Sequence, residues 1–569
     1  MQFEAKGWME MPLFCENCGS KLSSDGFFCE NCGHSVSYAA EARSAIMTAQ
    51  NLTLFSHKDW AEQWNRLVSA GEYEAYGLIL TNTSDCPEEM KEHFRTVLSK
   101  YIASRAQEQV CYCLLDMAEQ AVKNDFFGRN TNKVEFIVNV LKEIYAVAEA
   151  GYLLIIGDRR CIASVKWKNG IYSQEEGGDW DKYVDSDLPY ITLDTDSPFE
   201  GGSLSFHIAA GRIPSAAHNG FPEACIYLEN VMDHNAGKTL VDSFVLSAQE
   251  WEKVSQNNFG GVHPAIYACP PTSLVEEMRQ YGLNILPGNA SHNLLCFNLH
   301  GSTTSHYWYS GSGHIAYSPE CLPLNGNVKY VLATEACYGA KPVLEEGQQQ
   351  SVLISAIKNR CLGFVGSTQI AYGISDVGYQ LGARPSCADV LVGRFANNAA
   401  AGYTLGESYM KGLSAITVAY DGQGKKEIKG EEIKTVASFA LYGDPSVHFV
   451  QGNCMKSSRM SVSGKFFHIP MPDVRRAVSM RLTKVSSQLS EMIGRYVTEN
   501  YGDLADSKIV YYKVDGYNGY KAICQRTNQF IKGVLSIYFT PNGTVEQVYV
   551  SKYHQGEGRS CEKESSSLD

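Results

Sequence analysis

Two short stretches of the chain decide how the fold is interpreted: residues 293–302 read NLLCFNLHGS, and residues 329–340 read KYVLATEACYGA. Each begins with an apolar run of the length typical of a β-strand that is buried on both faces. Each run ends in a reactive side chain, His300 in the first stretch and Cys337 in the second. The pair predicts two strands of one sheet that carry an imidazole and a thiol at their ends.

Similar apolar runs occur elsewhere in the chain: GYLLIIGD (151–158), LVDSFVLS (240–247) and RCLGFVGST (360–368). Segments with helical spacing of apolar residues lie between the runs: PTSLVEEMRQYG (271–282) and EEGQQQSVLISAIKNR (345–360). Apolar strands that alternate with helices predict an α/β domain with a mostly parallel sheet flanked by helices. In such sheets ligands bind beyond the carboxyl ends of the strands, which is where His300 and Cys337 fall.

An imidazole and a thiol at one sheet edge predict a catalytic pair. The imidazole can take the proton of the thiol, which gives a nucleophile and a general acid/base. Gly301 follows the histidine and has no Cβ, so its amide can approach a substrate carbonyl and donate to the developing oxyanion. The amide of Cys337 is the natural second donor. The alternative is that both side chains are core residues at strand ends.

The His-Gly and Ala-Cys pairs after these strands resemble those of the caspase-like cysteine peptidases, and most closely those of the gingipain family. Further segments in the same order as in that family support the resemblance: GYLLIIGD, DSDLPYITLD (185–194), HIAAGRIPSAA (207–217), RCLGFVGSTQIAYG (360–373) and ASFALYGDPSVHF (437–449). The resemblance covers about residues 150–450. It implies a caspase/gingipain-like α/β fold and a cysteine endopeptidase that works through an acyl-enzyme.

The resemblance assigns roles to single residues. By position, His300 is the general acid/base and Cys337 is the nucleophile. The resemblance also implies a preference for Arg or Lys at P1, the substrate residue before the scissile bond. Asp187 matches the family position associated with a basic P1 side chain, and the alternative is that it caps a turn. Tyr372 falls near an aromatic position of the S1 pocket, and Asp376 is another carboxylate that could supply the charge.

The chain also departs from the gingipains. The stretch MQFEAKGWMEMPLF at the start is not a secretory signal, and the trailing module is not Ig-like, so we do not carry over substrate or biology. The basic segment KKEIKGEEIK (425–434) is either an exposed, solvated loop or a site of self-cleavage. The alternative to an enzyme is a catalytically inactive caspase-like scaffold or regulatory binding protein. Such a protein would use a zinc ribbon that the sequence predicts over residues 13–36.

Residues 13–36 predict a zinc ribbon. Two C-x-x-C pairs, each followed by Gly, lie ten residues apart and supply four thiolates: Cys15, Cys18, Cys29 and Cys32. Four thiolates close a structural Zn²⁺ site and leave no open position for catalysis. The thiolate mechanism itself needs no metal at the active site. The ribbon would be structural or would bind a regulatory protein partner, a role open to the C-terminal module as well. The alternative is four free thiols, and translation could start at Met1 or Met11.

The rest of the chain divides into five parts. We expect a helical region over 39–150, a peptidase N-terminal subdomain over 151–235, a catalytic subdomain over 236–452, a C-terminal α+β module over 455–553 and a disordered tail over 554–569. Cys111 and Cys113 fall in the helical region as core residues. The module is expected to begin with an amphipathic helix over 473–502 and to contain a hairpin at Asn542-Gly543.

The composition limits the classes of molecule that the protein is expected to bind. The chain has 569 residues with 49 Lys and Arg against 62 Asp and Glu, a net charge of −13. An acidic chain without a long basic run is not expected to bind nucleic acid or anionic membranes, which disfavours a zinc-ribbon nucleic-acid protein. No stretch of 18 apolar residues occurs. We expect a bacterial enzyme in the reducing cytoplasm, with a protein or peptide as substrate.

Overall fold

The computed structural model describes residues 60–551 with internal gaps. The residues outside the description are 1–59, 119–132, 148–150, 174–178, 202–203, 216–219, 263–265, 282–290, 324–327, 345–349, 418–425, 452–473, 478–479, 502–503, 505–506, 528–531 and 552–569. The predicted zinc ribbon over 13–36 and the predicted tail over 554–569 therefore lie outside the described residues.

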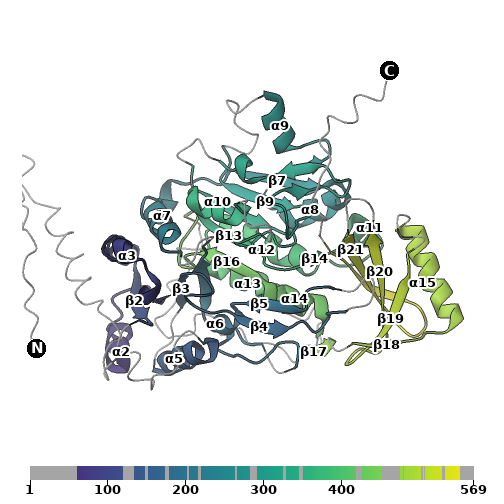
Figure 1. Cartoon of the computed structure of the whole chain (residues 1–569), viewed down its shortest axis with the longest axis horizontal. Coiled ribbons are helices and arrows are strands. Elements are labelled where there is room, and N and C mark those ends of the chain that lie inside the picture. Colours follow the sequence, from purple (N-terminus) through teal and green to yellow (C-terminus); the bar gives the residue numbers. More distant parts are fainter. Residues whose placement is uncertain are drawn as a thin grey trace, which may run out of the picture.

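A ten-stranded sheet runs through the centre of the molecule (Figure 1). In spatial order its strands are β2 (Val110–Asp116), β1 (Ala75–Thr81), β3 (Tyr152–Ile156), β6 (Ala209–Ile213), β16 (Phe439–Gly443), β13 (Cys361–Ser367), β12 (Tyr330–Thr334), β9 (Leu294–Asn298), β7 (Ser243–Ala248) and β8 (Tyr267–Cys269). Only β13 and β16 pair antiparallel within this sheet. The predicted α/β fold with a mostly parallel sheet flanked by helices is confirmed.

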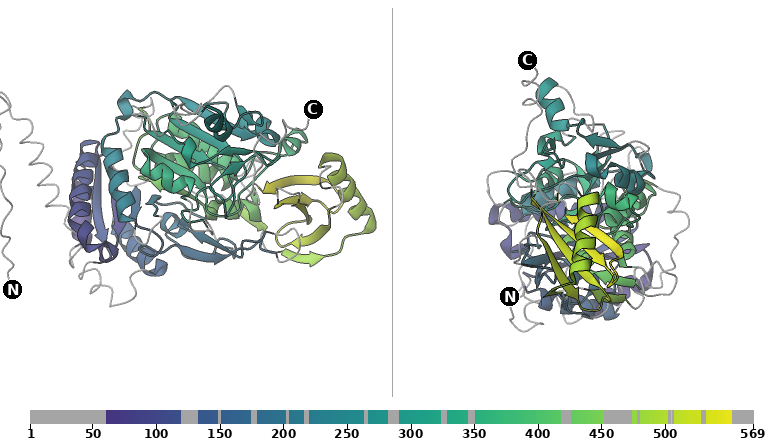
Figure 2. Two further views of the ribbon diagram at one scale, coloured as in Figure 1. Left: turned by 45° about the horizontal axis from the view of Figure 1, so that its top comes forward. Right: turned by 90° about the vertical axis from the view of Figure 1, so that its right-hand side faces the viewer.

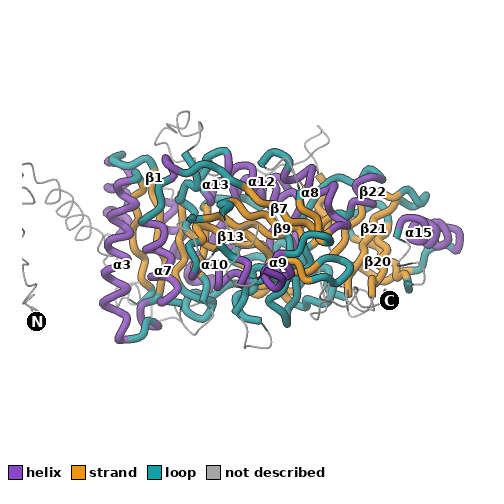
Figure 3. The backbone as a smooth tube through the Cα atoms, turned by 90° about the horizontal axis from the view of Figure 1, so that it is seen from above, coloured by secondary structure: helices purple, strands orange, loops and turns teal. Residues whose placement is uncertain are grey.

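Helices cover both faces of the sheet, as the view from above shows (Figure 3). One face carries α3 (Glu88–Gln107), α7 (Phe221–Met232), α9 (Leu274–Tyr281) and α10 (Val352–Lys358), and the other carries α8 (Glu252–Phe259), α12 (Ala388–Ala400) and α13 (Leu405–Thr417). Every residue of β3, β9 and β12 is buried, because each strand has a helical layer on both sides. The apolar runs expected as strands are thus confirmed.

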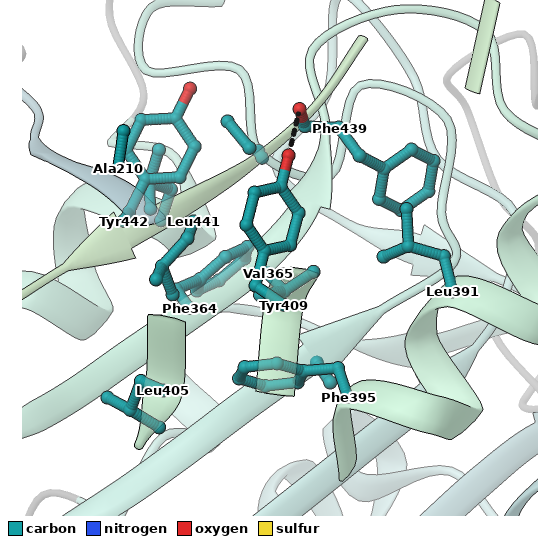
Figure 4. Packing of buried hydrophobic residues seen from close by; sticks show 14 of the residues in the cluster. Ala210, Phe364, Val365, Leu391, Phe395, Leu405, Tyr409, Phe439, Leu441 and Tyr442 are labelled. Carbon is teal, nitrogen blue, oxygen red and sulfur yellow. Dashed lines mark hydrogen bonds between the residues drawn. The ribbon is translucent and has the colours of Figure 1, made fainter. Parts of the chain in front are cut away.

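Apolar side chains from α12 and α13 pack onto the middle of the sheet (Figure 4). Phe395 of α12 and Leu405 of α13 are fully buried. Tyr409 of α13 lies above β16, and its hydroxyl donates to the carbonyl oxygen of Phe439 at 2.8 Å. This contact satisfies the buried hydroxyl and fixes the helix over the first residue of β16.

The predicted helical region over 39–150 is wrong in part. The helices α2 (Trp60–Ala70), α3 and α5 (Val134–Val147) form as expected, but β1 and β2 lie between them and extend the main sheet. All seven residues of β1 are buried, and a fully buried apolar strand has no period that separates it from a buried helix. Cys111 and Cys113 are core residues as predicted, on β2 rather than on a helix.

Residue 150 is not a structural boundary either, since β1 pairs with β3 as well as with β2. Asp444, in the Gly-Asp-Pro-Ser segment after β16, ties these strands to the rest of the domain. Its buried carboxylate accepts hydrogen bonds from Tyr112 on β2 at 2.5 Å and from Tyr101 on α3. It also lies 3.6 Å from the guanidinium of Arg105. The described residues between 60 and 147 therefore belong to the main domain.

The C-terminal module is a separate antiparallel sheet with one helix, and it faces the viewer in the right-hand view of Figure 2. Its strands are β18 (Met480–Thr483), β19 (Ile509–Val514), β20 (Tyr520–Thr527), β21 (Lys532–Phe539) and β22 (Val545–Ser551), with β14 (Tyr372–Gly373) from the main domain at one edge. The predicted hairpin joins β21 and β22, and Gly543 has φ +89°. An α+β module is thus present.

The helix predicted over 473–502 is too long. The structure has β17 (Val474–Ala477) and β18 before α15 (Ser487–Asn500). The helix starts where the Ser486 side chain accepts a hydrogen bond from the amide of Leu489 at 3.2 Å. β18 instead pairs with β19, so the backbone hydrogen bonds of the preceding residues are made in a sheet.

The segment over 425–434 is not the exposed loop that its charge suggested. Its described part forms β15 (Lys426–Lys429) and the start of α14 (Gly430–Ser438), and every residue of α14 is buried. The charges pair within the protein, because Glu431 binds Lys521 and Lys434 binds two aspartates. In the described part of the chain, no helix is both long and apolar enough to cross a bilayer.

Candidate active site

The two strands that carry His300 and Cys337 are direct neighbours. β9 and β12 pair in parallel, and partners are 37 residues apart, from Leu294 with Val331 to Phe297 with Thr334. His300 and Cys337 are also 37 residues apart. The register therefore places them opposite each other just past the carboxyl ends of the two strands, as the sequence predicted.

Gly301 lies directly against the backbone of Cys337. A Cβ on Gly301 would be 2.0 Å from the carbonyl oxygen of Cys337, much closer than real contacts allow. A glycine is thus required at this position for close approach of two backbones rather than for a left-handed conformation. The contact brings the His-Gly and Ala-Cys segments together.

Glu250 completes the surroundings of His300. The imidazole Nε2 lies 2.9 Å from the Glu250 carboxylate oxygen Oε1, and the ring packs on Trp251 with centroids 4.3 Å apart. His300 is fully buried. A ring that donates Nε2–H to a carboxylate carries its acceptor at Nδ1 when neutral, so Glu250 sets both tautomer and orientation.

Sequence reasoning missed Glu250, although a signal for it was present. The glutamate lies two residues past the end of β7, the strand within the run LVDSFVLS, and β7 pairs in parallel with β9. The rule that led to His300 and Cys337, the search for polar side chains after the carboxyl ends of parallel strands, also leads to Glu250. Three neighbouring strands thus supply a carboxylate, an imidazole and a thiol.

The thiol of Cys337 is fully buried. Its Sγ accepts a hydrogen bond from the Ala371 amide at 3.2 Å and lies 3.5 Å from the carbonyl oxygen of the same residue. The next residue, Tyr338, has φ +54°, in the left-handed region that favours glycine. The chain therefore turns sharply after the thiol.

Tyr338 is anchored beside a buried charged cluster. Its hydroxyl donates to Asp181 Oδ1 at 2.5 Å, and Asp181 is bound by Lys434 at 2.7 Å. Burial lowers the pKa of Lys434, but Asp179 and Asp181 raise it further, so its pKa lies above the ordinary value and the amine stays charged. Nothing in the sequence indicates that Lys434 meets Asp179 and Asp181, because the lysine comes from a distant segment.

The residues predicted to bind substrate have other partners in the structure. Asp187 forms a two-pronged ion pair with Arg212, with both nitrogen–oxygen distances 2.7 Å. Asp376 accepts hydrogen bonds from the amides of Lys253 and Val254 at the start of α8. Both carboxylates thus stabilise the fold, and binding of a basic side chain by Asp187 would require a substrate to compete with the protein's own guanidinium.

Tyr372 lies close to Cys337 but is turned away from solvent. It follows Ala371, the residue that contacts the thiol, and it is 1% exposed. Its hydroxyl donates to Asp179 Oδ2 at 2.6 Å. The side chain thus belongs to the buried charged cluster, and its place in an S1 pocket stays a prediction. The predicted zinc ligands, Cys15, Cys18, Cys29 and Cys32, lie outside the described residues.

Comparisons with known proteins add little to this geometry. No family model matches the chain, and no curated protein does. Eight solved chains match. One is described as "Structure of Protease"; it is 13% identical, and the alignment covers 84% of this chain and 97% of that one, with a TM-score of 0.43. A match at that level assigns neither a family nor a catalytic type.

Proposed function

We propose that the protein is a cysteine endopeptidase in which Cys337 is the nucleophile and His300 the general acid/base. The register of β9 and β12 carries this proposal, since it sets the two residues opposite each other beyond the carboxyl ends of neighbouring strands. Glu250 adds a third group that orients the base, the arrangement expected of an activated nucleophile.

In the first half of the reaction, His300 takes the thiol proton and the sulfur attacks the peptide carbonyl carbon. Amides of Gly301 and Cys337 are proposed to donate to the oxyanion that forms. The C–N bond then breaks, and the imidazolium gives its proton to the leaving amine, which leaves a thioester on Cys337. In the second half, His300 takes a proton from water, hydroxide displaces the sulfur, and the acid product leaves with the thiol restored.

Glu250 would stabilise the imidazolium during both halves without taking part in bond changes. Its oxygen is 2.9 Å from His300 Nε2, so a positive charge on the ring is met by a carboxylate at hydrogen-bond distance. Cys337 has no exposed surface, so a substrate must displace part of the surrounding chain before attack. We therefore expect slow reaction with small thiol reagents and faster reaction with reagents that bind as peptides.

The finer parts of the proposal concern specificity and surroundings. We keep a preference for Arg or Lys at P1, to be tested with a panel of peptides that differ only at that residue. We place the enzyme in a reducing compartment, because all twelve described cysteines are free, buried thiols. The ribbon cysteines are proposed to hold a structural Zn²⁺, and the ribbon to bind a regulatory protein.

Covalent labelling tests the proposal. The wild-type protein is incubated with a peptidyl-arginine chloromethyl ketone, and the adduct is located by mass spectrometry. We expect one adduct, on Cys337, and none in Cys337→Ala. Cys321→Ala, which removes another fully buried thiol, is the matched control and should label normally. Labelling that persists in Cys337→Ala, or its absence from a folded wild-type protein together with no cleavage of unfolded protein substrates, would rule out the assignment and favour a binding role.

A further inference from the structure

Tyr338 adopts a backbone conformation that the surrounding structure must enforce. Its φ of +54° is unfavourable for a residue with a Cβ, and it occurs at the residue after the proposed nucleophile. Two contacts hold it: its amide donates to the carbonyl of Gln369 at 2.9 Å, and its hydroxyl donates to Asp181 at 2.5 Å. The direction in which Cys337 presents its thiol thus depends on a side chain from another segment.

Asp181 connects the two segments that meet at the thiol. One carboxylate oxygen accepts from the Tyr338 hydroxyl, and the other accepts from the Ile370 amide at 2.8 Å. Ile370 precedes Ala371, whose amide binds the sulfur of Cys337. A single carboxylate therefore fixes the chain after the nucleophile and the chain that contacts its sulfur.

Lys434 holds Asp181 in place. Its fully buried amine lies 2.7 Å from Asp181 Oδ2 and 2.5 Å from Asp179 Oδ2. Asp179 in turn accepts from the hydroxyl of Tyr372. A buried carboxylate next to a nucleophile is stable only with a charged partner, and Lys434 supplies that partner from α14.

The C-terminal module packs against α14 (Figure 1). Glu431, three residues before Lys434 on the same helix, binds the amine of Lys521 on β20 at 2.6 Å and the hydroxyl of Tyr538 on β21 at 2.9 Å. Both ionised side chains are at most 2% exposed. The module also pairs with β14, whose Tyr372 lies opposite Ser551.

We propose that Asp181 is a positioning residue for Cys337, held by Lys434, and that the C-terminal module is built into this framework through α14 and β14. The proposal rests on the function proposed above. Asp181 touches neither the reacting sulfur nor the base; it acts through Tyr338 and Ile370. The module would then be required for full catalytic rate rather than only for recruitment of partners.

Tyr338→Phe tests the contact between Tyr338 and Asp181, because it removes the hydroxyl that binds the carboxylate and keeps the ring. We expect kcat to fall by about 10- to 100-fold, with KM changed less than about twofold, because a misplaced nucleophile slows chemistry without changing substrate contacts. Lys434→Met should behave in the same way, and Lys434→Arg should restore part of the rate. Tyr379→Phe, which removes a surface hydroxyl bound to Asn257, should have normal kinetics.

Lys521→Met and Tyr538→Phe test the contacts between the C-terminal module and Glu431 of α14. Arg481→Gln is the control, since Arg481 pairs with Asp515 on the module surface. We expect kcat to fall at least threefold in Lys521→Met and in Tyr538→Phe and to stay unchanged in the control. All rates are measured well below each variant's unfolding temperature, and the folded fraction is checked by circular dichroism. Unchanged kcat in Lys521→Met and Tyr538→Phe would overturn the proposed role of the module in catalysis.

Hydrogen exchange separates this proposal from the proposed function. Faster exchange of the amides over 337–341 and 369–372 in Tyr338→Phe is expected whether or not the protein cleaves peptides. An active wild-type enzyme whose Tyr338→Phe variant has normal kcat and normal exchange would overturn the positioning role alone. A rise in kcat would also overturn it, because the framework would then restrain the enzyme. A wild-type protein that shows faster exchange in the variant but no peptidyl labelling would overturn only the peptidase.

Discussion

Gly301 and Cys337 touch through their backbones, since a Cβ on the glycine would lie 2.0 Å from the carbonyl oxygen of the cysteine. The contact joins the ends of β9 and β12 at the point where the imidazole and the thiol emerge. Both backbones are held by fully buried strands, so neither segment can retreat without disturbing the core.

Gly301→Ala should therefore inactivate the enzyme and also lower its stability. The added methyl must push the Cys337 carbonyl aside, and a displacement of about 1 Å costs about 100-fold in rate. Peptide cleavage and urea unfolding measure the two effects. Gly494→Ala on α15 is the control, because nothing lies within 4 Å of its Cβ, and it should be fully active. Normal cleavage by Gly301→Ala would contradict the proposed geometry.

Glu250→Gln should lower kcat by about 100-fold or more, as expected when the residue that orients a catalytic imidazole loses its charge. A neutral amide stabilises an imidazolium less than a carboxylate does, so the acid limb of the pH–rate profile, where the base becomes protonated, should move to lower pH. Glu252→Gln, which changes an exposed residue of the same segment, serves for comparison. A glutamine variant with wild-type rate would show that the 2.9 Å contact to His300 is only structural.

Asp187→Asn should affect stability and leave P1 preference unchanged. Burial raises the pKa of Asp187, but Arg212 lowers it more, so the pKa lies below its ordinary value. The ion pair therefore stabilises the fold fully above about pH 4 and is lost as the pH falls through the lowered pKa. We expect the free energy of unfolding at pH 7 to fall by about 3 kcal/mol.

Urea unfolding and a P1 peptide panel distinguish the two roles of Asp187, with the exposed Asp196→Asn as control. A stable Asp187→Asn protein that loses its preference for Arg or Lys would restore the substrate-binding role implied by the family resemblance.

Two partly buried histidines should make the fold sensitive to mild acid. Burial lowers the pKa of His448, whose Nδ1 lies 2.9 Å from the Gly402 carbonyl oxygen, and likewise that of His234. The unfolded chain then binds protons more readily below about pH 6.5, so stability is fully present above that pH and declines toward the lowered pKa. The urea concentration at the midpoint of unfolding should be lower at pH 6.0 than at pH 7.5. The decrease should be smaller in His448→Gln. Equal midpoints for the wild type would contradict this.

The ribbon cysteines should hold one zinc ion per chain. We expect metal analysis to find zinc in the purified protein and to find it missing from a Cys15→Ser/Cys18→Ser variant, since a site with two of four thiolates binds weakly. Cleavage of short peptides should be normal in that variant, because the proposed mechanism uses no metal. Zinc retained by the double variant would place the metal elsewhere in the chain.

The sequence was sufficient to predict the fold wherever a local pattern of apolar residues is compatible with one kind of secondary structure. The runs before His300 and Cys337 are strands, and their order along the chain with helices between them predicted the parallel sheet. The pattern failed at β1, where seven consecutive buried residues read equally well as a helix. It also failed at α14, because charged residues such as Lys434 are normally exposed.

The site could be predicted in part for the same reason. Rules about strand ends selected His300 and Cys337 as candidates and could have selected Glu250 as well. Nothing local to Asp187 reveals Arg212 as its partner, and nothing local to Asp181 reveals Tyr338. Such pairings depend on tertiary contacts between segments far apart in the sequence, which a single chain without its fold does not disclose.

The position of β16 has a consequence for synthesis of the protein. This strand, at residues 439–443, is the bridge between β6 and β13 in the middle of the sheet. A nascent chain must therefore emerge as far as β16 before the two blocks of strands can join. Until then both blocks expose a strand edge that chaperones or neighbouring chains can reach, and the surroundings of the thiol that depend on α14 are not yet made. A growing polypeptide thus lacks the proposed peptidase site until β16 and α14 have both been made.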